Sequence, residues 1–443
     1  MAASALIIRV ISMIFRVFLS DRLGPQGLGL YQLVLSVYLV FGAMASTGVS
    51  LCATRVFSEL NALGQHGKAR FSVERCMILS FFIGASLGVL MLTTALPLST
   101  LVLHDKRTMP ALMLLAPSLP FLAVSACVRG YFLARKKTLP NCGEQLLEQV
   151  IEIGSFLVMF SFFQPQSLEQ ACMLTVAGTT GAEIVSFIYS LLCYRADIKS
   201  TGILPERTDG LVRSMLPVFL PVTANALLRW GMSAAENALI PIGLQKYGLS
   251  PAEALSQYGV ICGMTLPVLT FPSVIVLPFA SLIVSEISEE RVCGNTAAVR
   301  RITEKMVSCA LRYSLPVTVV FVFYGTPICE ALFGSAEAGR YLSLLAPVIP
   351  FMYLDSVVDS ILKGLNEQTS YFIFNTIDST LRILLTIFLL PSMGIVGAAA
   401  VIITSELINT LMSLLRLVKI TSFRIRIWWD IIVPLLCALI FCL

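Results

Sequence analysis

The sequence predicts an all-α polytopic membrane protein with two parallel six-helix bundles and a C-terminal hydrophobic helix, about 13 segments in all. Composition is the first evidence: 57% of the 443 residues are hydrophobic and only 13% are charged, whereas ordinary soluble domains carry roughly 25% charged residues. Apolar runs long enough to cross a bilayer also recur along the whole chain, and one half of the sequence weakly repeats the other.

The apolar runs define the segments in order. The first half contains runs at residues 5–20, 28–54, 76–103, 109–134, 141–163 and 168–194. The second half contains runs at 212–241, 255–285, 305–326, 340–364, 371–391 and 394–417. A last run begins at Trp428, is short for a full span, and is expected to be truncated or to end at the interface.

Basic residues predict the orientation. Most Lys and Arg residues lie in connections after even-numbered segments, whereas connections after odd-numbered segments hold only Arg22, Lys106, Arg107, Lys246 and Arg340. The positive-inside rule therefore places the N-terminus and the even connections in the cytoplasm. The net charge of +5 is explained by this bias, and nucleic acid is not expected as a partner.

An internal repeat predicts the division into bundles. "APSLPF" at 116–121 recurs as "APVIPF" at 346–351, and "EIVSFIYSLL" from Glu183 resembles "ELINTLMSLL" from Glu406. These matches pair the fourth, fifth and sixth segments with the tenth, eleventh and twelfth. We therefore expect an N-terminal six-helix bundle at 1–200, a C-terminal bundle at 201–420, and an additional membrane segment at 421–443. Parallel repeats of this kind are typical of rocking transporters.

Two arginines lie inside the first apolar run, "LIIRVISMIFRVFL". Arg9 and Arg16 are seven residues apart, so they share one face of a helix. Arg9 could extend to the cytoplasmic surface, whereas Arg16 could extend only toward the outer surface. Arginine forks bind multi-oxygen anions well, so the pair predicts an anionic ligand such as a pyrophosphate.

Carboxylates and further arginines occur in both predicted bundles, which favours a water-filled central cavity. Glu148, Glu152 and the pair Asp355 and Asp359 are candidate sites for a coupling cation or proton. Simpler roles are expected for the other intramembrane charges. Glu144 is solvated, Asp378 neutralises Arg382, Arg312 extends to the cytoplasmic face, and Arg229 either pairs with Glu236 or lies in the cavity.

The sequence lacks the motifs of several common kinds of functional site. The 12 cysteines form no C-x-x-C pair, and His66 and His104 have no metal-ligand spacing around them, so neither a metal site nor a disulfide framework is expected. No phosphate-binding G-x-x-x-x-G-K-[ST] loop is present. We expect no catalytic residues and no cofactor, with Na⁺ or H⁺ as the coupling ion.

The stretches "RVISMIFRVFLSDRLGPQGLGLYQL" and "ASTGVSLCATRVFSE" resemble the start of the stage V sporulation protein B family. "EQLLEQVIEI" and "ALSQYGVICGMTLPVLTFPSVIVLPFASLIVSEISEE" fit the same family. That family is part of the MOP flippase superfamily, with murein lipid II flippases, polysaccharide exporters and MATE multidrug antiporters.

The resemblance implies alternating access and a lipid-linked sugar carried to the outer leaflet. It implies that Arg9, Arg16 and, from its position near the second helix, Arg55 hold the pyrophosphate, and we add Arg229 as a candidate from its place in the seventh segment. Two departures are visible: Ser12 stands where relatives often have glycine, and about 13 segments replace the usual fourteen.

The leading prediction is a flippase for an undecaprenyl-pyrophosphate-linked glycan, such as lipid II or a polysaccharide precursor, in cell-wall, spore-cortex or capsule assembly. It would act as a monomer among lipids of the bacterial cytoplasmic membrane. A cation-coupled multidrug exporter is the alternative. A membrane glycosyltransferase or polymerase is disfavoured by the absence of long external loops, and a structural assembly factor would not need charges in both bundles.

Overall fold

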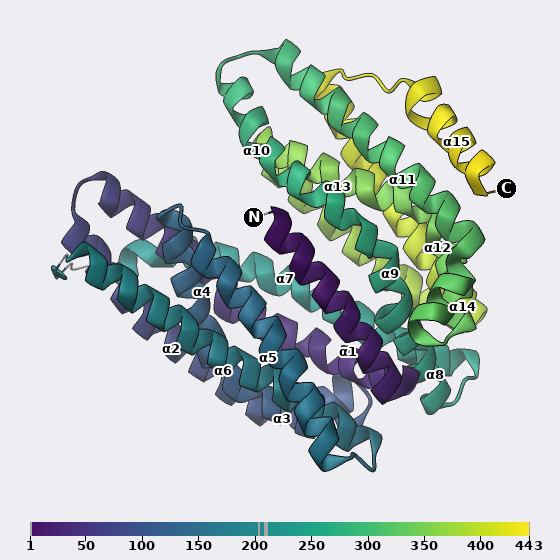
Figure 1. The fold of residues 1–443 in the computed structure, drawn as a ribbon, viewed down its shortest axis with the longest axis horizontal. Helices are drawn as coiled ribbons and strands as arrows, with labels where there is room; N and C mark the ends of the chain where they lie inside the picture. Colours follow the sequence, from purple (N-terminus) through teal and green to yellow (C-terminus); the bar gives the residue numbers. More distant parts are fainter. Residues whose placement is uncertain (1, 203, 208–210, 443) are drawn as a thin grey trace. The chain divides into compact units, whose positions relative to one another are not determined.

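The computed structural model describes residues 2–202, 204–207 and 211–442, which are almost entirely helical (Figure 1). Nine helical spans in this part of the chain are long and apolar enough to cross a membrane. Two of them, Leu6–Ala62 and Gln368–Thr421, each contain two predicted segments. The predicted seventh and last segments are the helix Leu211–Tyr247 and the shorter apolar helix Trp428–Ile440. The all-α polytopic prediction is confirmed.

The described chain divides into two compact units. Unit 1 is Leu30–Ala238, and unit 2 combines Ala2–Gly29 with Leu239–Leu443. The first half of α1 therefore packs in the unit that otherwise contains the C-terminal half of the chain. Close backbone approach explains this, because a Cβ at Gly259 would lie 1.9 Å from the carbonyl oxygen of Pro25. The bounds predicted from the repeat, 1–200, 201–420 and 421–443, stay a prediction.

Unit 1 contains the second half of α1, the part of α7 up to Ala238, and the helices between them, among which α2 packs on α4 and α5 packs on α6 (Figure 1). The elements as the structure has them are α1 (Ala2–Ala62), α2 (His66–Pro97), η1 (Leu98–Val102), η2 (Lys106–Thr108), α3 (Met109–Leu115), η3 (Ala116–Ser118), α4 (Leu119–Ala134), α5 (Leu139–Phe163), α6 (Leu168–Thr201) and α7 (Leu211–Tyr247).

Unit 2 adds the remaining helices, whose apolar core lies among α10, α11, α13 and α14. Its elements are α8 (Pro251–Tyr258), η4 (Gly259–Thr265), α9 (Leu266–Thr270), η5 (Phe271–Ile275), α10 (Val276–Val292), α11 (Thr296–Phe333), α12 (Ala336–Leu345), η6 (Ala346–Val348), α13 (Ile349–Gly364), α14 (Gln368–Thr421), η7 (Trp428–Ile432) and α15 (Val433–Cys442).

Glycine breaks the two longest helices where the sequence predicted separate segments. Gly24 in α1 has φ 66° and Gly394 in α14 has φ 57°, a region that residues with a side chain rarely adopt. Pro25 and Pro391 lie beside these breaks and remove backbone donors. Each long helix therefore acts as two membrane segments.

The two copies of the short motif have the same local structure. "APSLPF" begins with the 3-10 turn η3 and "APVIPF" with the 3-10 turn η6. Each turn is followed by a 16-residue helix, α4 in unit 1 and α13 in unit 2. Proline cannot supply the amide hydrogen of a continuous α-helix, so the same spacing gives the same interruption. This agreement supports the internal repeat.

Candidate functional site

The first half of α1 is helical through both predicted arginines. Arg9 and Arg16 are separated by about 10 Å of helix rise and roughly 20° of rotation, so they lie on one face. Arg9 is exposed, whereas Arg16 is half-buried. Arg16 shares its side of the helix with the buried Leu19 and Leu23, and Arg9 is close enough to the buried Tyr353 of α13 to interact electrostatically with it.

The opposite face of the same helix is apolar and exposed. Ile7, Ile14 and Phe18 leave between 44% and 51% of their surface uncovered within the described chain. At about 100° per residue these three side chains point roughly 180° away from Arg9 and Arg16. An exposed apolar stripe on a membrane helix is suited to lipid, and on the opposite face Arg16 is partly covered by the rest of its unit.

Arg55 and Arg229 lie in unit 1 and are both exposed. Arg55 Nε donates to Glu59 Oε1 at 2.6 Å, one helical turn away, and both side chains are 58% exposed. This exposed pair leaves the guanidinium accessible to a ligand. The substrate-binding roles of Arg9, Arg16, Arg55 and Arg229 stay predictions.

A carboxylate cluster lies among α4, α5 and α6 of unit 1. Arg129 of α4 donates from Nη1 to Oε1 of Glu144 at 2.9 Å. Glu144 is only 1% exposed, so the expectation that it is solvated was wrong: its position near the end of α5 is covered, and Arg129 balances its charge. Glu183 of α6 is also buried.

The coupling candidates of unit 1 lie in the same cluster. Glu152 accepts hydrogen bonds from Thr179 Oγ1 at 2.9 Å and from Gln149 Nε2 at 3.2 Å. Glu148 is half-buried one turn earlier on α5. Both carboxylates therefore lie on the helix face that the predicted four-residue spacing indicated.

A second cluster lies on α13 and the two halves of α14 in unit 2. Arg382 donates from Nε to Asp378 Oδ2 at 3.0 Å, which confirms the expected neutralisation. Its Nη2 also donates to Glu406 Oε2 at 2.8 Å, beyond the break at Gly394. No local pattern indicates this second partner, because 24 residues separate the two positions.

The coupling candidates of unit 2 lie on α13. Asp355 is buried, and its Oδ2 accepts a hydrogen bond from Asn409 Nδ2 at 3.0 Å. Its Oδ1 accepts no hydrogen bond within the described structure. Asp359 follows one turn later on the same helix. A buried carboxylate oxygen without a hydrogen bond is a candidate acceptor for a proton or a cation.

Arg312, which was expected to extend to the cytoplasmic face, is half exposed and has a buried partner that was not expected. Its Nε and Nη2 donate to Asp430 Oδ1 at 3.0 and 2.8 Å, and Asp430 is fully buried. Sequence reasoning missed Asp430 because it lies just after "WW" at the start of the last apolar run. A lone acid in such a run is the signal that could have found it.

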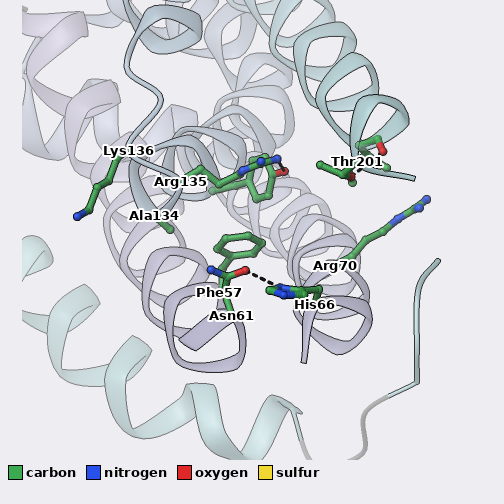
Figure 2. Close-up of a pocket in the computed structure, with 10 residues that line it drawn as sticks. Phe57, Asn61, His66, Arg70, Ala134, Arg135, Lys136 and Thr201 are labelled. Carbon is green, nitrogen blue, oxygen red and sulfur yellow. Dashed lines mark hydrogen bonds between the residues drawn. The ribbon is translucent and has the colours of Figure 1, made fainter. Parts of the chain in front are cut away.

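Unit 1 also has a basic cavity of about 430 Å³ at the ends of α1, α2, α4 and α6 (Figure 2). His66 hydrogen-bonds through Nδ1 to Asn61 Oδ1 at 2.8 Å. Arg135 forms an ion pair with Asp197, and Lys137 Nζ reaches the same carboxylate at 2.6 Å. Arg70, the other arginine of the lining, donates from Nε to Glu74 Oε1 at 2.9 Å, so both arginines of this cavity are already paired.

Comparison with known proteins gives a consistent class. The MatE family model matches residues 1–143. Stage V sporulation protein B of Bacillus subtilis (strain 168) is 26% identical over 434 residues, which covers 96% of this chain and 83% of that protein. Lipid II flippase MurJ of the same organism is 20% identical over 419 residues, 88% of this chain and 76% of that protein.

A solved structure agrees with this class. Lipid II flippase MurJ in an inward closed conformation superposes with a TM-score of 0.74 at 15% identity, over 99% of this chain and 90% of that chain. This likeness shows the fold. The chain has the apolar helices of a multi-pass membrane protein, and its resemblance to stage V sporulation protein B is confirmed. The relative whose name states an activity is a flippase, which agrees with the prediction that the chain is not an enzyme.

Proposed function

We propose that this protein flips an undecaprenyl-pyrophosphate-linked glycan, lipid II or a polysaccharide precursor, to the outer leaflet of the bacterial cytoplasmic membrane. The observation that carries the proposal is the first half of α1, where Arg9 and the half-buried Arg16 share one face and an exposed apolar stripe lies on the opposite face. A prenyl tail in lipid and a pyrophosphate on two arginine forks need such a two-sided helix. The relation to a lipid II flippase supports this substrate class.

The cycle that we propose is alternating access by a monomer whose N-terminus is cytoplasmic. The pyrophosphate binds Arg9 and Arg16, with Arg55 and Arg229 as further contacts, and the head group crosses while the tail stays in lipid. Na⁺ or H⁺ resets the transporter at Glu148, Glu152, Asp355 or Asp359. Membrane potential is a second source of energy, worth about 2.3 kcal/mol per charge for each 100 mV. No catalytic step and no further cofactor are needed.

Binding of undecaprenyl pyrophosphate to the purified protein tests the arginine face. We expect Arg16→Gln to weaken binding at least tenfold and Arg16→Lys to be intermediate, because lysine keeps the charge but loses the bidentate fork. Arg22→Gln is the matched control, since Arg22 is on the same first half of α1, just before the break at Gly24, and is highly exposed. Unchanged binding by Arg16→Gln would remove the basis of the proposal.

A cation-coupled multidrug exporter is the second candidate. It is favoured by the carboxylate clusters of both units, which would suit a cationic substrate. Export of a cationic dye in a sodium or proton gradient by liposomes containing the protein, without movement of the lipid pyrophosphate, would select this function.

A further inference from the structure

The second basic cavity, in unit 2, has a volume of about 670 Å³. It lies between the first half of α11 and the segment that follows α14. Its lining is Arg301, Glu304, Lys305, Ser308, Cys309, Arg312, Tyr313, Arg424 and Arg426. Five of these nine residues are cations and one is a carboxylate, so the cavity is strongly positive.

Most of the cations in this cavity are not paired with a carboxylate in the described part of the chain. Arg301, Lys305, Arg424 and Arg426 form no ion pair with any carboxylate that the structure describes. Glu304 already accepts from Arg300 Nε at 2.9 Å and from the backbone nitrogen of Arg424 at 3.1 Å. Four cations around one cavity repel one another unless an anion binds there.

The cavity wall is held in place by the buried Asp430. Besides Arg312, this carboxylate accepts from Ser308 Oγ and from the backbone nitrogen of Arg426, both at 3.0 Å. These bonds join α11 to the segment before α15. Because the hydrogen bonds of Asp430 are directed at Arg312, Ser308 and a backbone amide, the side chains of Arg424 and Arg426 remain available to a ligand.

Exposed apolar side chains follow the cations directly. Ile427, Trp428 and Trp429 are each 60% to 63% exposed within the described chain. Tryptophan is enriched where hydrocarbon meets head groups. At 38 residues, α11 is about 57 Å long, which exceeds the roughly 30 Å hydrocarbon core, so its first turns extend to the head-group level.

We propose that this cavity binds the phosphate of an anionic glycerophospholipid, whose acyl chains lie along Trp428, Trp429 and α15. Arg424 and Arg426 provide forks for the phosphate oxygens, and Arg301 and Lys305 supply further charge. The bound lipid holds the C-terminal helix against α11. This site does not depend on the proposed function, because it shares no residue with the arginines of α1.

Tryptophan fluorescence offers a direct test, because the chain has only three tryptophans. In a Trp230→Phe variant of the full chain, emission comes from Trp428 and Trp429 alone. We would compare quenching in nanodiscs that contain phosphatidylglycerol or phosphatidylcholine spin-labelled near the head group. Stronger quenching by phosphatidylglycerol is expected, and it should fall as salt is added.

The variant Arg424→Gln/Arg426→Gln should abolish this preference. At about a factor of five for each basic residue at an anionic surface, the affinity should drop roughly 30-fold. Arg75→Gln/Arg195→Gln removes the same charge from exposed arginines of unit 1 that form no ion pair among the described residues, and it should leave the preference unchanged. Equal thermal unfolding midpoints would show that both double variants fold.

Three results would overturn the proposal. Equal quenching by the two lipids would mean that the cavity does not select an anionic head group. Loss of quenching on addition of millimolar inorganic phosphate would identify a site for free phosphate. Preferential displacement of phosphatidylglycerol by undecaprenyl pyrophosphate would assign the cavity to the transported substrate.

Discussion

The two units contain the same charges in different places. Unit 1 has four carboxylates and one arginine in its cluster, namely Glu144, Glu148, Glu152, Glu183 and Arg129. Unit 2 also has four and one, namely Asp355, Asp359, Asp378, Glu406 and Arg382. The repeat offset of 230 pairs Arg129 with Asp359 and Glu152 with Arg382, so the arginine has moved from the fourth segment to the eleventh.

The difference shows what a membrane bundle requires. A buried carboxylate needs a donor or a proton, but the donor can come from any neighbouring helix. In unit 1 the arginine lies on α4 and contacts one carboxylate of α5, whereas in unit 2 it lies on α14 and contacts two. The two halves therefore match in the balance of charge and differ in its position.

Positive and negative residues also exchange places between the two halves outside the membrane segments. Lys137, in the connection after α4, contacts Asp197 of α6, and the residue 230 positions later is Glu367, which accepts from Arg416 Nη2 at 2.8 Å. Each ion pair joins the connection to a later helix, α6 in unit 1 and α14 in unit 2. The connection supplies the cation in unit 1 and the carboxylate in unit 2.

The largest expected effect is that of Arg382→Gln. The substitution leaves Asp378 and Glu406 without their shared cation, which should cost about 5 kcal/mol of unfolding free energy, the upper end for a broken buried pair. Denaturant unfolding of the protein in detergent measures this loss. Arg382→Lys is the control and should retain part of the stability. A loss below about 1 kcal/mol would show that water already screens the charges of the cluster.

Arg129→Gln should cost less, about 3 kcal/mol, because one carboxylate instead of two loses its partner. Adding Glu144→Gln should recover most of that loss, as measured by a double-mutant cycle. If Arg129→Gln were more damaging than Arg382→Gln, the comparison between the clusters would be reversed.

Removing a single hydrogen bond to a carboxylate should have the next largest effect on stability. Asn409→Ala removes the amide from Asp355 and should cost about 2 kcal/mol, whereas Thr179→Val leaves Glu152 with Gln149 and should cost about 1 kcal/mol. Unfolding midpoints of the two variants check this order. Equal costs would mean that Asp355 has a replacement donor.

The smallest expected effect on stability is that of the ion pair between Arg416 and Glu367, in the connection between α13 and α14. The hydrogen bond from Arg416 lowers the pKa of Glu367 below its ordinary value. Its contribution is therefore complete above the pKa of the unfolded chain, about 4.5, and is lost as pH falls through the lower pKa of the folded state. Wild type should lose slightly more stability than Glu367→Gln between about pH 6 and pH 3, by less than about 1 kcal/mol. Identical pH profiles would contradict the assignment.

The sequence predicted those features that depend on local pattern. Apolar length located the segments, including those that the structure separates at Gly24 and Gly394, and the repeated Ala-Pro motif indicated the internal repeat whose two copies share a 3-10 turn. Contacts between distant helices were not predictable from pattern. The burial of Glu144, the bond from Arg382 to Glu406 and the pairing of Arg312 with Asp430 all depend on which helices become neighbours, and no local spacing encodes that.

Leaflet exchange of a fluorescent lipid-linked disaccharide pyrophosphate is the most direct test of the central claim. The purified protein would be reconstituted in liposomes, as wild type and as Arg16→Ala. The proposed flippase moves the lipid in wild type and fails in the variant, since Arg16 lies on the face that holds the pyrophosphate. Wild-type liposomes that move no lipid but export a cationic dye in a sodium or proton gradient would contradict it.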